Sequence, residues 1–464
     1  MIQPRLSVRS VRSVRSVRQH LHARGRLLAL SALALITACT TTAPPAPDAG
    51  SDGAAELRRQ EGELVFENIP EIPAALVERL RQYQEVRSAA LQGWLPSGEL
   101  LISTRFGETS QIHRVAAPGG ARQQLTFFSE PVGGAEPSPD PERPGFLYLR
   151  DAGGSEFYQV YFFDLASGRS QLLTDGESRN SSAIFSPNGA RIAYASTRRN
   201  GRDTDVWVGD LDPDSHRALT SESGSWFPLD FSPDGSRLIV LRYVSRSEAH
   251  PFVVDLDSGA MTAILDPDRA VRVDGVAFGP DGRSIYLTSD FGGEFVRLYR
   301  LDRPGARPVA VTGNVDHDVE GFELSPDGRH LAWTINEESE SRLFVRNLDR
   351  GSFVALPQLP EGVFYGLAFA PEGDHLGFTV NGARSPGDIH SIDLAARTLT
   401  RWTESEVGGL DRESFVAPAH FRYPTFDTPG GVRAGPDDAR RAIPAFIYRP
   451  REREAVEGSE GSEG

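Results

Sequence analysis

FSPDGSRLIV, at residues 231–240, is one of five plain copies of a motif that recurs through the middle of the chain. The other plain copies are FSPNGARIAY at 185–194, FGPDGRSIYL at 278–287, LSPDGRHLAW at 324–333 and FAPEGDHLGF at 369–378. Two degenerate copies precede them, WLPSGELLI at 94–102 and PSPDPERPGFLYL at 137–149. Each copy has a proline at the second position of its turn, and these prolines lie 43 to 48 residues apart: Pro96, Pro139, Pro187, Pro233, Pro280, Pro326 and Pro371. So constant a period indicates a repeat architecture.

Each copy has the composition of a tight turn between two apolar runs. Serine can bond back to the backbone, proline presets φ at the second position, Asp or Asn suits the third, and glycine closes the turn. A second hairpin follows, for example VYFFDLASGRSQLLT at 160–174 and VWVGDLDPDSHRALT at 206–220. Four strands in about 46 residues are typical of a propeller blade. The sequence therefore predicts an all-β fold, a seven-bladed β-propeller with four-stranded blades at residues 88–404.

The composition excludes some classes of partner. The chain has 464 residues and a net charge of −15, and all 49 of its cationic residues are arginine. Seven of these arginines precede residue 27, so removal of that segment would bring the charge to −15 − 7 = −22. Nucleic acids and anionic membrane surfaces favour basic proteins, and we therefore expect neither as a partner.

The N-terminus predicts export. Residues 1–26 are basic, and the apolar run that follows, 27–38, has twelve residues, whereas a membrane span needs about 20. We expect a signal peptide at 1–38 followed by Cys39, the only cysteine, in a context that resembles a bacterial lipobox. This resemblance implies lipidation of Cys39, and Thr40 after it implies the periplasmic face of the outer membrane in the bacterial cell envelope. The alternative is a leftover cysteine near an ordinary cleavage site.

The other segments outside the repeats have distinct compositions. Residues 39–60 predict a flexible tether, and 61–87 an N-terminal segment with an amphipathic helix at 72–86 whose Leu76, Leu80 and Tyr83 share one side. Residues 405–450 predict a linker that ends in a strand at Ile443–Pro450, and 451–464 a disordered acidic tail. A strand needs a pairing partner for its backbone, and the sequence suggests none nearby.

Strand alternation divides the loops of a propeller between two faces. The repeat turns and the second-hairpin turns share one face, and the loops between second and third strands share the other with the inter-blade loops. On rigid scaffolds, variable loops usually carry function. The candidate substrate-gating or rim residues there are Arg150, Asp151, Glu156, Tyr158, Arg179, Arg198, Asp290 and Glu294, with Asn200, Asp203 and Asp205 beside them. The alternative is that such a rim is charged because it faces water.

Motifs for metals, cofactors and catalysis are weak or absent. Asp210, Asp212 and Asp214 have the opening spacing of a calcium loop, but Ser215 replaces its glycine and Ser221 its final glutamate. Residues 316–318, Asp-His-Asp, have no second histidine nearby in sequence. The chain contains no G-x-S-x-G nucleophile elbow, and we assign no catalytic residue, cofactor or metal.

From about Glu61 to Pro450 the chain resembles the prolyl oligopeptidase family of serine peptidases, especially its acylaminoacyl-peptidase and dipeptidyl-peptidase-like bacterial members. The resemblance rests on the repeat turns, LISTRFGETSQIHRV at 101–115, RQQLTFFSEPV at 122–132, RDAGGSEFYQ at 150–159, LLTDGESRN at 172–180, STRRNG at 196–201 and RRAIPAFIYRP at 440–450. It implies a propeller followed by an α/β-hydrolase domain, whose first strand would be Ile443–Pro450. It also implies that the propeller admits only short, flexible peptides.

Three functions remain open at this point. The first is the substrate-gating propeller of a secreted, lipid-anchored serine peptidase of this family, catalytically incomplete in the given sequence. Its partners would be short peptides and the missing hydrolase domain. The alternative is a non-enzymatic periplasmic binding or scaffold propeller of the Tol type, which shares the repeat motif. A glycan-processing propeller would need paired carboxylates in the central channel, which sequence cannot place.

Overall fold

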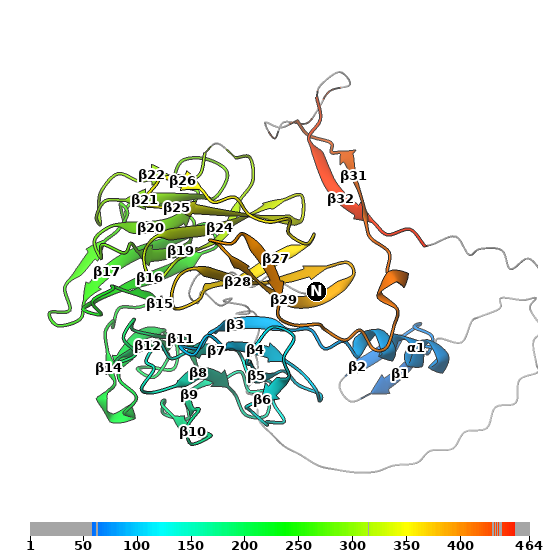
Figure 1. Ribbon diagram of the computed structural model, residues 1–464, viewed down its shortest axis with the longest axis horizontal. Helices are drawn as coiled ribbons and strands as arrows, with labels where there is room; N and C mark the ends of the chain where they lie inside the picture. Colours follow the sequence, from blue (N-terminus) through cyan, green and yellow to red (C-terminus); the bar gives the residue numbers. More distant parts are fainter. Residues whose placement is uncertain are drawn as a thin grey trace, which may run out of the picture. The chain divides into compact units, whose positions relative to one another are not determined.

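The computed structural model describes residues 58–61, 64–313, 315–428, 431, 433, 435 and 439–450 (Figure 1). The predicted signal peptide, Cys39, most of the predicted tether and the acidic tail lie outside the described residues. Within the described ranges, none of the helices has the length and apolar character needed to cross a membrane.

The N-terminal unit, which ends at Arg81, contains a small hairpin and most of the predicted helix. Strands β1 (Arg58–Glu61) and β2 (Leu64–Glu67) pair antiparallel. Helix α1 (Ala74–Gln84) begins after Pro73, whose carbonyl accepts hydrogen bonds from the amides of Leu76 and Val77. The predicted helix is therefore confirmed, and the side chains predicted to share one side are about half exposed.

Seven four-stranded sheets follow the N-terminal unit along the chain. Blade 1 contains β3 (Ala90–Trp94), β4 (Leu100–Thr104), β5 (Gln111–Val115) and β6 (Arg122–Gln124). Blade 2 contains β7 (Ala135–Pro137), β8 (Gly145–Arg150), β9 (Gln159–Asp164) and β10 (Arg169–Leu172). Blade 3 contains β11 (Asn180–Phe185), β12 (Ile192–Ser196), β13 (Asp205–Gly209) and β14 (Arg217–Ala218), with the 3₁₀ turn η1 (Pro213–Ser215) before its last strand.

The remaining four blades repeat this order. Blade 4 contains β15 (Ser225–Phe231), β16 (Arg237–Ser245), β17 (Glu248–Asp255) and β18 (Met261–Ala263), and blade 5 contains β19 (Val273–Phe278), β20 (Ile285–Ser289), β21 (Arg297–Leu301) and β22 (Val309–Ala310). Blade 6 contains β23 (Val319–Leu324), β24 (His330–Glu337), β25 (Glu340–Asn347) and β26 (Ser352–Phe353). Blade 7 contains β27 (Val363–Phe369), β28 (His375–Gly382), β29 (Ser385–Asp393) and β30 (Thr398–Arg401). All pairs are antiparallel between chain neighbours, which confirms the seven-bladed, all-β prediction.

The hydrophobic core lies between neighbouring blades. One cluster joins blades 4 and 5 through buried residues such as Ile239, Leu241, Val276 and Leu287. Every residue of the second strands β4, β12 and β20 is buried, whereas the fourth strands are short and largely exposed. Burial therefore decreases from the second strand outward, as expected for sheets that pack face to face around an axis.

The ring closes without sharing a strand between its ends. All four strands of blade 1 come from the start of the propeller and all four of blade 7 from its end, where β27 returns beside β3 (Figure 1). Side-chain hydrogen bonds cross this joint: the amide of Leu91 donates to Thr379 Oγ1 (2.9 Å) and Trp94 Nε1 donates to the Ala368 carbonyl (3.0 Å). The rings of Trp94 and Trp402 meet edge to face, 5.4 Å apart between centroids.

A buried threonine fixes the third strand to the fourth in five blades. In each, the threonine hydroxyl accepts a hydrogen bond from the backbone amide fourteen residues earlier, at 2.9–3.3 Å. The threonines are Thr126, Thr174, Thr220, Thr312 and Thr403. The bond provides an acceptor for a buried amide at the start of the third strand, where the short fourth strand pairs only partly.

The repeat turns have the predicted chemistry. In the turn of blade 4, Gly235 has φ of +68° and Asp234 accepts hydrogen bonds from the Ser232 hydroxyl and from the amide and hydroxyl of Ser236. These bonds favour the ionised carboxylate and lower the pKa of Asp234 to about 2, from an ordinary value of 3.8. Asn188 accepts the equivalent bonds in blade 3 without carrying a charge.

We predict that Asp234→Asn leaves the fold intact and reduces its acid sensitivity. Because the pKa of Asp234 is lower in the folded state, its contribution is complete above the unfolded value near 4 and is lost as the pH falls towards about 2. Urea unfolding at pH 7 and at pH 3 measures the effect: the loss of stability on acidification should be smaller in the variant. Equal losses in variant and wild type would contradict the prediction.

The C-terminal strand is not alone, which corrects the prediction of an unpaired strand. After the 3₁₀ turn η2 (Arg412–Ser414), β31 (Ala419–Pro424) pairs antiparallel with β32 (Ala442–Ile447). Seventeen residues separate the partner from β32, and its run AHFRYP lies outside the repeat and is too short for its alternation of apolar and charged residues to predict a strand. This strand pair resembles the start of another domain.

Candidate functional site

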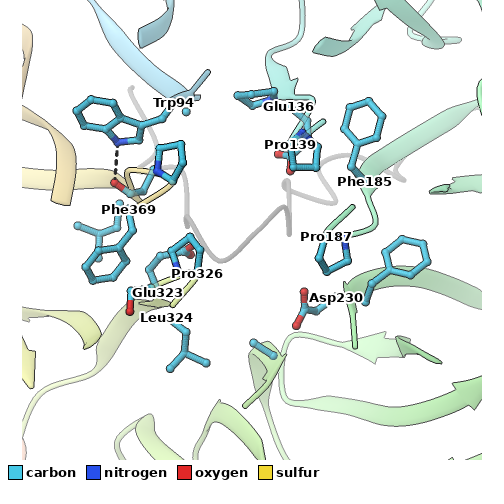
Figure 2. A pocket seen from close by; sticks show the side chains of 18 of the residues that line it. Trp94, Glu136, Pro139, Phe185, Pro187, Asp230, Glu323, Leu324, Pro326 and Phe369 are labelled. Carbon is cyan, nitrogen blue, oxygen red and sulfur yellow. Dashed lines mark hydrogen bonds between the residues drawn. The ribbon is translucent and has the colours of Figure 1, made fainter. Parts of the chain in front are cut away.

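A cavity of about 630 Å³ lies on the propeller axis (Figure 2). Its walls are the first strands of all seven blades and the turns that follow them. All seven repeat prolines line it, so the turns that revealed the repeat also form the mouth of the cavity: Pro96, Pro139, Pro187, Pro233, Pro280, Pro326 and Pro371. Aromatic rings, among them Trp94 and Phe185, make up much of the wall between them.

Three carboxylates come from first strands on different sides of this cavity, and Figure 2 labels all of them: Glu136, Asp230 and Glu323. They occupy the same repeat position in blades 2, 4 and 6, two residues before the Ser-Pro pair. The odd-numbered blades have Gly93, Ile184, Ala277 and Ala368 there. Asp230 is buried and accepts a hydrogen bond from the amide of Phe278 at 2.8 Å, which ties blade 4 to blade 5.

The described residues contain no group of three acidic, histidine or cysteine side chains that could hold a metal ion. The two sets of residues that the sequence offered as weak metal-binding candidates, Asp210, Asp212 and Asp214 and residues 316–318, contain side chains with other roles. Asp212 caps η1 by accepting a hydrogen bond from the amide of Asp214, and Asp318 accepts one from the amide of Val296 and pairs with Arg272 at 3.3 Å. Both sets therefore have structural partners.

Six of the eight predicted rim residues lie in adjoining loops of blades 2 and 3. Arg150 ends β8, and Asp151, Glu156 and Tyr158 lie in the loop that leads to β9. Arg179 precedes β11 and Arg198 follows β12. Asp290 and Glu294 belong to the loop between β20 and β21 in blade 5, so the structure does not place them in this group.

Several of these side chains shape the rim rather than extend into solvent. The guanidinium of Arg150 packs over the ring of Phe128 at 4.3 Å and pairs with Glu130 at 3.6 Å. Asp151 is buried and accepts a hydrogen bond from the amide of Glu156 at 2.8 Å. Burial raises the pKa of Tyr158, with the negative charge of Asp151 adding to the effect. Asp290 likewise caps the loop before β19, because its carboxylate accepts a hydrogen bond from the amide of Arg272.

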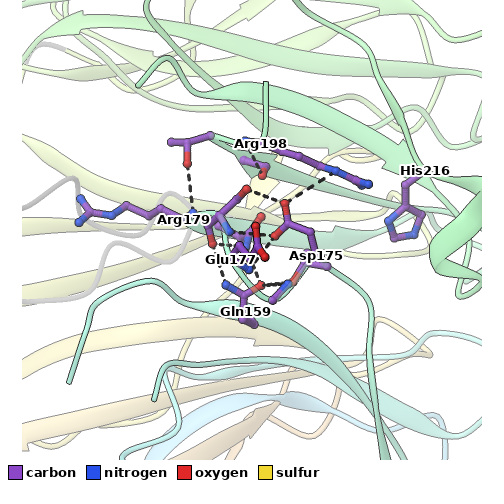
Figure 3. Close-up of polar contacts among 12 residues, drawn as sticks. Gln159, Asp175, Glu177, Arg179, Arg198 and His216 are labelled. Carbon is purple, nitrogen blue, oxygen red and sulfur yellow. Dashed lines mark hydrogen bonds and ion pairs between the residues drawn. The ribbon is translucent and has the colours of Figure 1, made fainter. Parts of the chain in front are cut away.

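A polar network centred on Asp175 stabilises the loop between blades 2 and 3, which joins β10 to β11 (Figure 3). Asp175 accepts hydrogen bonds from the amides of Glu177 and Ser178 and from the Ser178 hydroxyl, and Arg198 lies 3.7 Å away. Burial alone would raise the pKa of Asp175, but these bonds outweigh it and leave the pKa below its ordinary value. Gln159 joins the same loop by donating to the Ser178 carbonyl at 2.7 Å. The rim is therefore a rigid surface at this point.

Arg179 and Phe157 form the exposed part of this rim. The guanidinium of Arg179 stacks over the Phe157 ring at 5.1 Å, and both residues are exposed. Arg179 was predicted from the sequence, whereas Phe157 and Asp175 were not, although they lie in the segments 150–159 and 172–180 that carry the family resemblance. The three axial carboxylates were not predicted either; their signal in the sequence is an acidic residue before the apolar position in every second copy of the repeat.

Comparison with known proteins gives partial matches. A family model described as the TolB beta propeller domain, PD40, matches residues 146–321. An uncharacterized protein from Agrobacterium fabrum, Atu1656, is 29% identical over 185 residues, which are 38% of this chain and 60% of that protein. The uncharacterized peptidase YuxL from Bacillus subtilis is 25% identical over 179 residues, 38% of this chain and 25% of that protein.

Solved structures give longer matches at lower identity. A structure from a study of two prolyl endopeptidases superposes with a TM-score of 0.64 at 14% identity, covering 82% of this chain and 56% of that chain. Puromycin hydrolase superposes with a TM-score of 0.62 at 16% identity, covering 80% and 60%. The chain thus spans little more than half of these proteins. The resemblance to the prolyl oligopeptidases is confirmed for the fold, a seven-bladed propeller, in superpositions that cover about four fifths of the chain.

Proposed function

We propose that this chain is the substrate-gating propeller of a secreted, lipid-anchored serine peptidase of the prolyl oligopeptidase type. The peptidase would act on short peptides, and its chemistry would reside in an α/β-hydrolase domain that the sequence does not contain. In such a domain a serine, a histidine and an acid would carry out acyl transfer. The observation that supports this proposal best is the hairpin of β31 and β32.

The two faces of this hairpin differ in polarity. Residues directly opposite on paired strands share a face, and successive residues alternate between faces. The register pairs Phe421 with Ala445 and Tyr423 with Ile443, so one face is wholly apolar: Ala419, Phe421, Tyr423, Ile443, Ala445 and Ile447. The other face carries His420 and Arg422, opposite Phe446 and Pro444.

The charged face is attached to the propeller and the apolar face is exposed. His420 Nε2 lies 3.5 Å from Glu340 Oε1, and Arg422 pairs with Glu338, both at the turn between β24 and β25. Phe421 and Tyr423 on the opposite face are more than two fifths exposed. A two-stranded sheet with an uncovered apolar face is marginal in water, so its composition favours further strands or helices packed upon it.

The attachment point indicates where such a domain would lie. The turn between β24 and β25 joins a second strand to a third, so it shares a face of the propeller with the loops that carry Arg179 and Phe157. A hydrolase domain built on the hairpin would cover this face. Peptides would then reach it past the rim or along the axis, where a cavity of about 630 Å³ excludes folded proteins by size.

The test is to sequence the locus beyond codon 450, translate all three frames, and express the longest continuous product in a Gram-negative host. We expect a G-x-S-x-G elbow, with cleavage of short peptides but not of folded proteins. Replacing Cys39 by serine should move the product from the membrane fraction to the soluble periplasm without changing its specific activity. Absence of a hydrolase in every frame would refute the peptidase proposal, and unchanged membrane association of the Cys39→Ser protein would refute the lipid anchor.

A second candidate is a periplasmic binding propeller of the TolB type. The match of the PD40 family model to residues 146–321 favours it, because that model is described as the TolB beta propeller domain. A binding propeller of this type does not explain the apolar face of the hairpin, and we therefore place this candidate second. The same sequencing experiment distinguishes the two, since a binding propeller would be followed by no hydrolase.

A further inference from the structure

We propose that the outer edge of blade 6 binds an extended peptide segment in which an apolar residue is followed by threonine. The segment would add to the third strand of the blade, β25, at a point that the short fourth strand does not reach. The residues that form this site belong to blades 6 and 7 and to the loop between them, so the inference does not depend on a hydrolase domain.

The other blades show what normally occupies this position. In six blades an apolar residue just after the fourth strand donates its amide to a third-strand carbonyl at 2.7–2.9 Å: Leu125, Leu173, Leu219, Ile264, Val311 and Trp402. In five of them the next residue is the buried threonine, whose hydroxyl accepts from the amide of that same third-strand residue. In blade 4 the third-strand residue is Pro251, which has no amide to satisfy. An apolar residue followed by threonine therefore completes both backbone groups of one third-strand residue.

Blade 6 lacks this arrangement. Its fourth strand, β26, has two residues, and Pro357 takes the position of the threonine. The corresponding third-strand residue is Leu343, which lies fourteen residues before Pro357 and pairs with Thr334 of β24. Ser341 and Val345 form backbone hydrogen bonds on the outer side of β25, away from β24. Because hydrogen-bonding directions alternate along a strand, the amide and carbonyl of Leu343 face the same outer side.

The loop after β26 contacts β25 on either side of Leu343 but not at this residue. The Val354 amide donates to the Val345 carbonyl at 2.8 Å, and the Ser341 amide donates to the Gly362 carbonyl at 3.0 Å. Between these contacts, no described residue bonds the amide or the carbonyl of Leu343, although Leu343 is only 8% exposed. Buried backbone groups are rarely left in this condition. The edge of β25 is therefore incomplete at Leu343.

A cavity of about 390 Å³ lies beside this incomplete edge. Leu343 and Phe344 line it from β25, Leu356 and Leu359 from the loop, and Phe364 from β27. Its volume falls within the range of about 300–1,000 Å³ found for ligand pockets. Space for an apolar side chain and two unbonded backbone groups thus occur together.

These features favour a peptide over other ligands. A residue in extended conformation presents its amide and its carbonyl on one side, so the edge of a strand is best completed by another extended chain. The loop cannot complete the edge in the usual way, because Pro357 has neither a hydroxyl nor a backbone N–H. The apolar–threonine pair found in five other blades provides one donor, one acceptor and an apolar side chain, which are the groups that this edge requires.

Fluorescence anisotropy with the full chain tests the proposal. The probe is the fluorescein-labelled peptide SHRALTSE, the sequence of residues 215–222, which contains the apolar–threonine pair of blade 3. Two analogues each lose one hydrogen bond. Valine in place of the threonine removes the hydroxyl at nearly constant shape, and N-methylation of the leucine removes its amide donor. We expect each analogue to bind about tenfold more weakly, because one buried group would then lack its partner.

Pro357→Thr should complete the edge from within the chain. We expect this variant to bind the probe at least about fivefold more weakly, since its own threonine would compete for the amide of Leu343. Pro267→Thr is the matched control: Pro267 is exposed in the loop between blades 4 and 5 and does not line the cavity, so the affinity should be unchanged. Melting curves establish that the variants fold.

Leu343→Pro separates the two hydrogen bonds. Blade 4 has Pro251 at the same position of its third strand, so the fold accepts proline there. The variant has no amide to donate to the threonine hydroxyl. The probe and its valine analogue should therefore bind this variant equally, whereas the N-methyl analogue should still bind more weakly than the probe.

Three results would overturn the proposal: no binding of the probe, equal binding of the probe and its valine analogue to the unaltered chain, or unchanged affinity in folded Pro357→Thr. The first two need no variant, so they decide the question even if a substitution prevents folding. Absence of a hydrolase domain at the locus would refute the proposed function and leave this binding site untouched.

Discussion

Replacing Trp402 by alanine is expected to lower the free energy of unfolding by about 3–5 kcal/mol, the usual cost of deleting a buried tryptophan ring. Trp402 is 7% exposed, meets Trp94 edge to face and donates from Nε1 to Ser391 at 2.9 Å. No strand is shared between blades 1 and 7, so contacts such as the one between Trp94 and Trp402 hold the two ends of the ring together. Urea unfolding followed by tryptophan fluorescence and circular dichroism measures the loss.

A matched substitution separates ring closure from general loss of core. Trp333→Ala removes a ring of the same size from blade 6, which is buried in the core between blades 5 and 6 and stacked on Phe344. Both variants should be destabilised, but only Trp402→Ala should increase amide exchange in β3 and β27, the strands that meet at the joint. Similar exchange in β3 for the two variants would contradict the role assigned to Trp402.

Asp388→Ala is expected to cost about 2–3 kcal/mol, because it leaves buried donors without an acceptor. The carboxylate of Asp388 is almost wholly buried and accepts hydrogen bonds from Ser385 at 2.7 Å, Thr403 at 3.0 Å and Arg401 at 2.6 Å. Loss of a buried partner can cost more, but the half-exposed guanidinium of Arg401 can turn to water. Chemical denaturation at pH 7 measures the effect.

Two comparisons qualify this expectation for Asp388. Asp257→Ala removes an exposed carboxylate from a turn of blade 4 and should change stability by less than about 0.5 kcal/mol. Asp205→Ala, at the start of the third strand of blade 3, should resemble Asp388→Ala because Asp205 is also fully buried and pairs with Arg199 at 2.7 Å. A stability of Asp388→Ala equal to that of Asp257→Ala would show that the network contributes little.

The blades could be predicted because each repeat turn is local. Its serine, proline, acid and glycine act within a few residues, and the period of the prolines then counts the blades. The pairing of β31 with β32 could not be predicted in this way, because seventeen residues separate the strands and β31 is short and mixed in character. The alternation of apolar and charged residues becomes meaningful only when the two strands are placed in register.

The same distinction between local and long-range features applies to the candidate sites. Loops that leave a strand could be assigned to one face of the propeller, which identified Arg150, Arg179 and their neighbours. Whether a side chain there extends into solvent or is held by the protein depends on partners from other loops, as Asp151 and Asp290 show. The axial carboxylates depend on closure of the whole ring, since Glu136, Asp230 and Glu323 approach a common cavity only when seven first strands surround it.

The absence of strand exchange also bears on how such a chain can be rearranged. Each sheet is encoded by one uninterrupted stretch, so every blade corresponds to one continuous segment of the chain. The two ends of the ring lie side by side, with Val86 bridged to Val407. A circular permutation that opened the chain between any two blades and joined these ends would therefore keep every sheet whole. In a propeller whose last blade takes one strand from the start of the chain, that blade is built from two separate segments. The same rearrangement would join these two segments and so change how the blade is encoded.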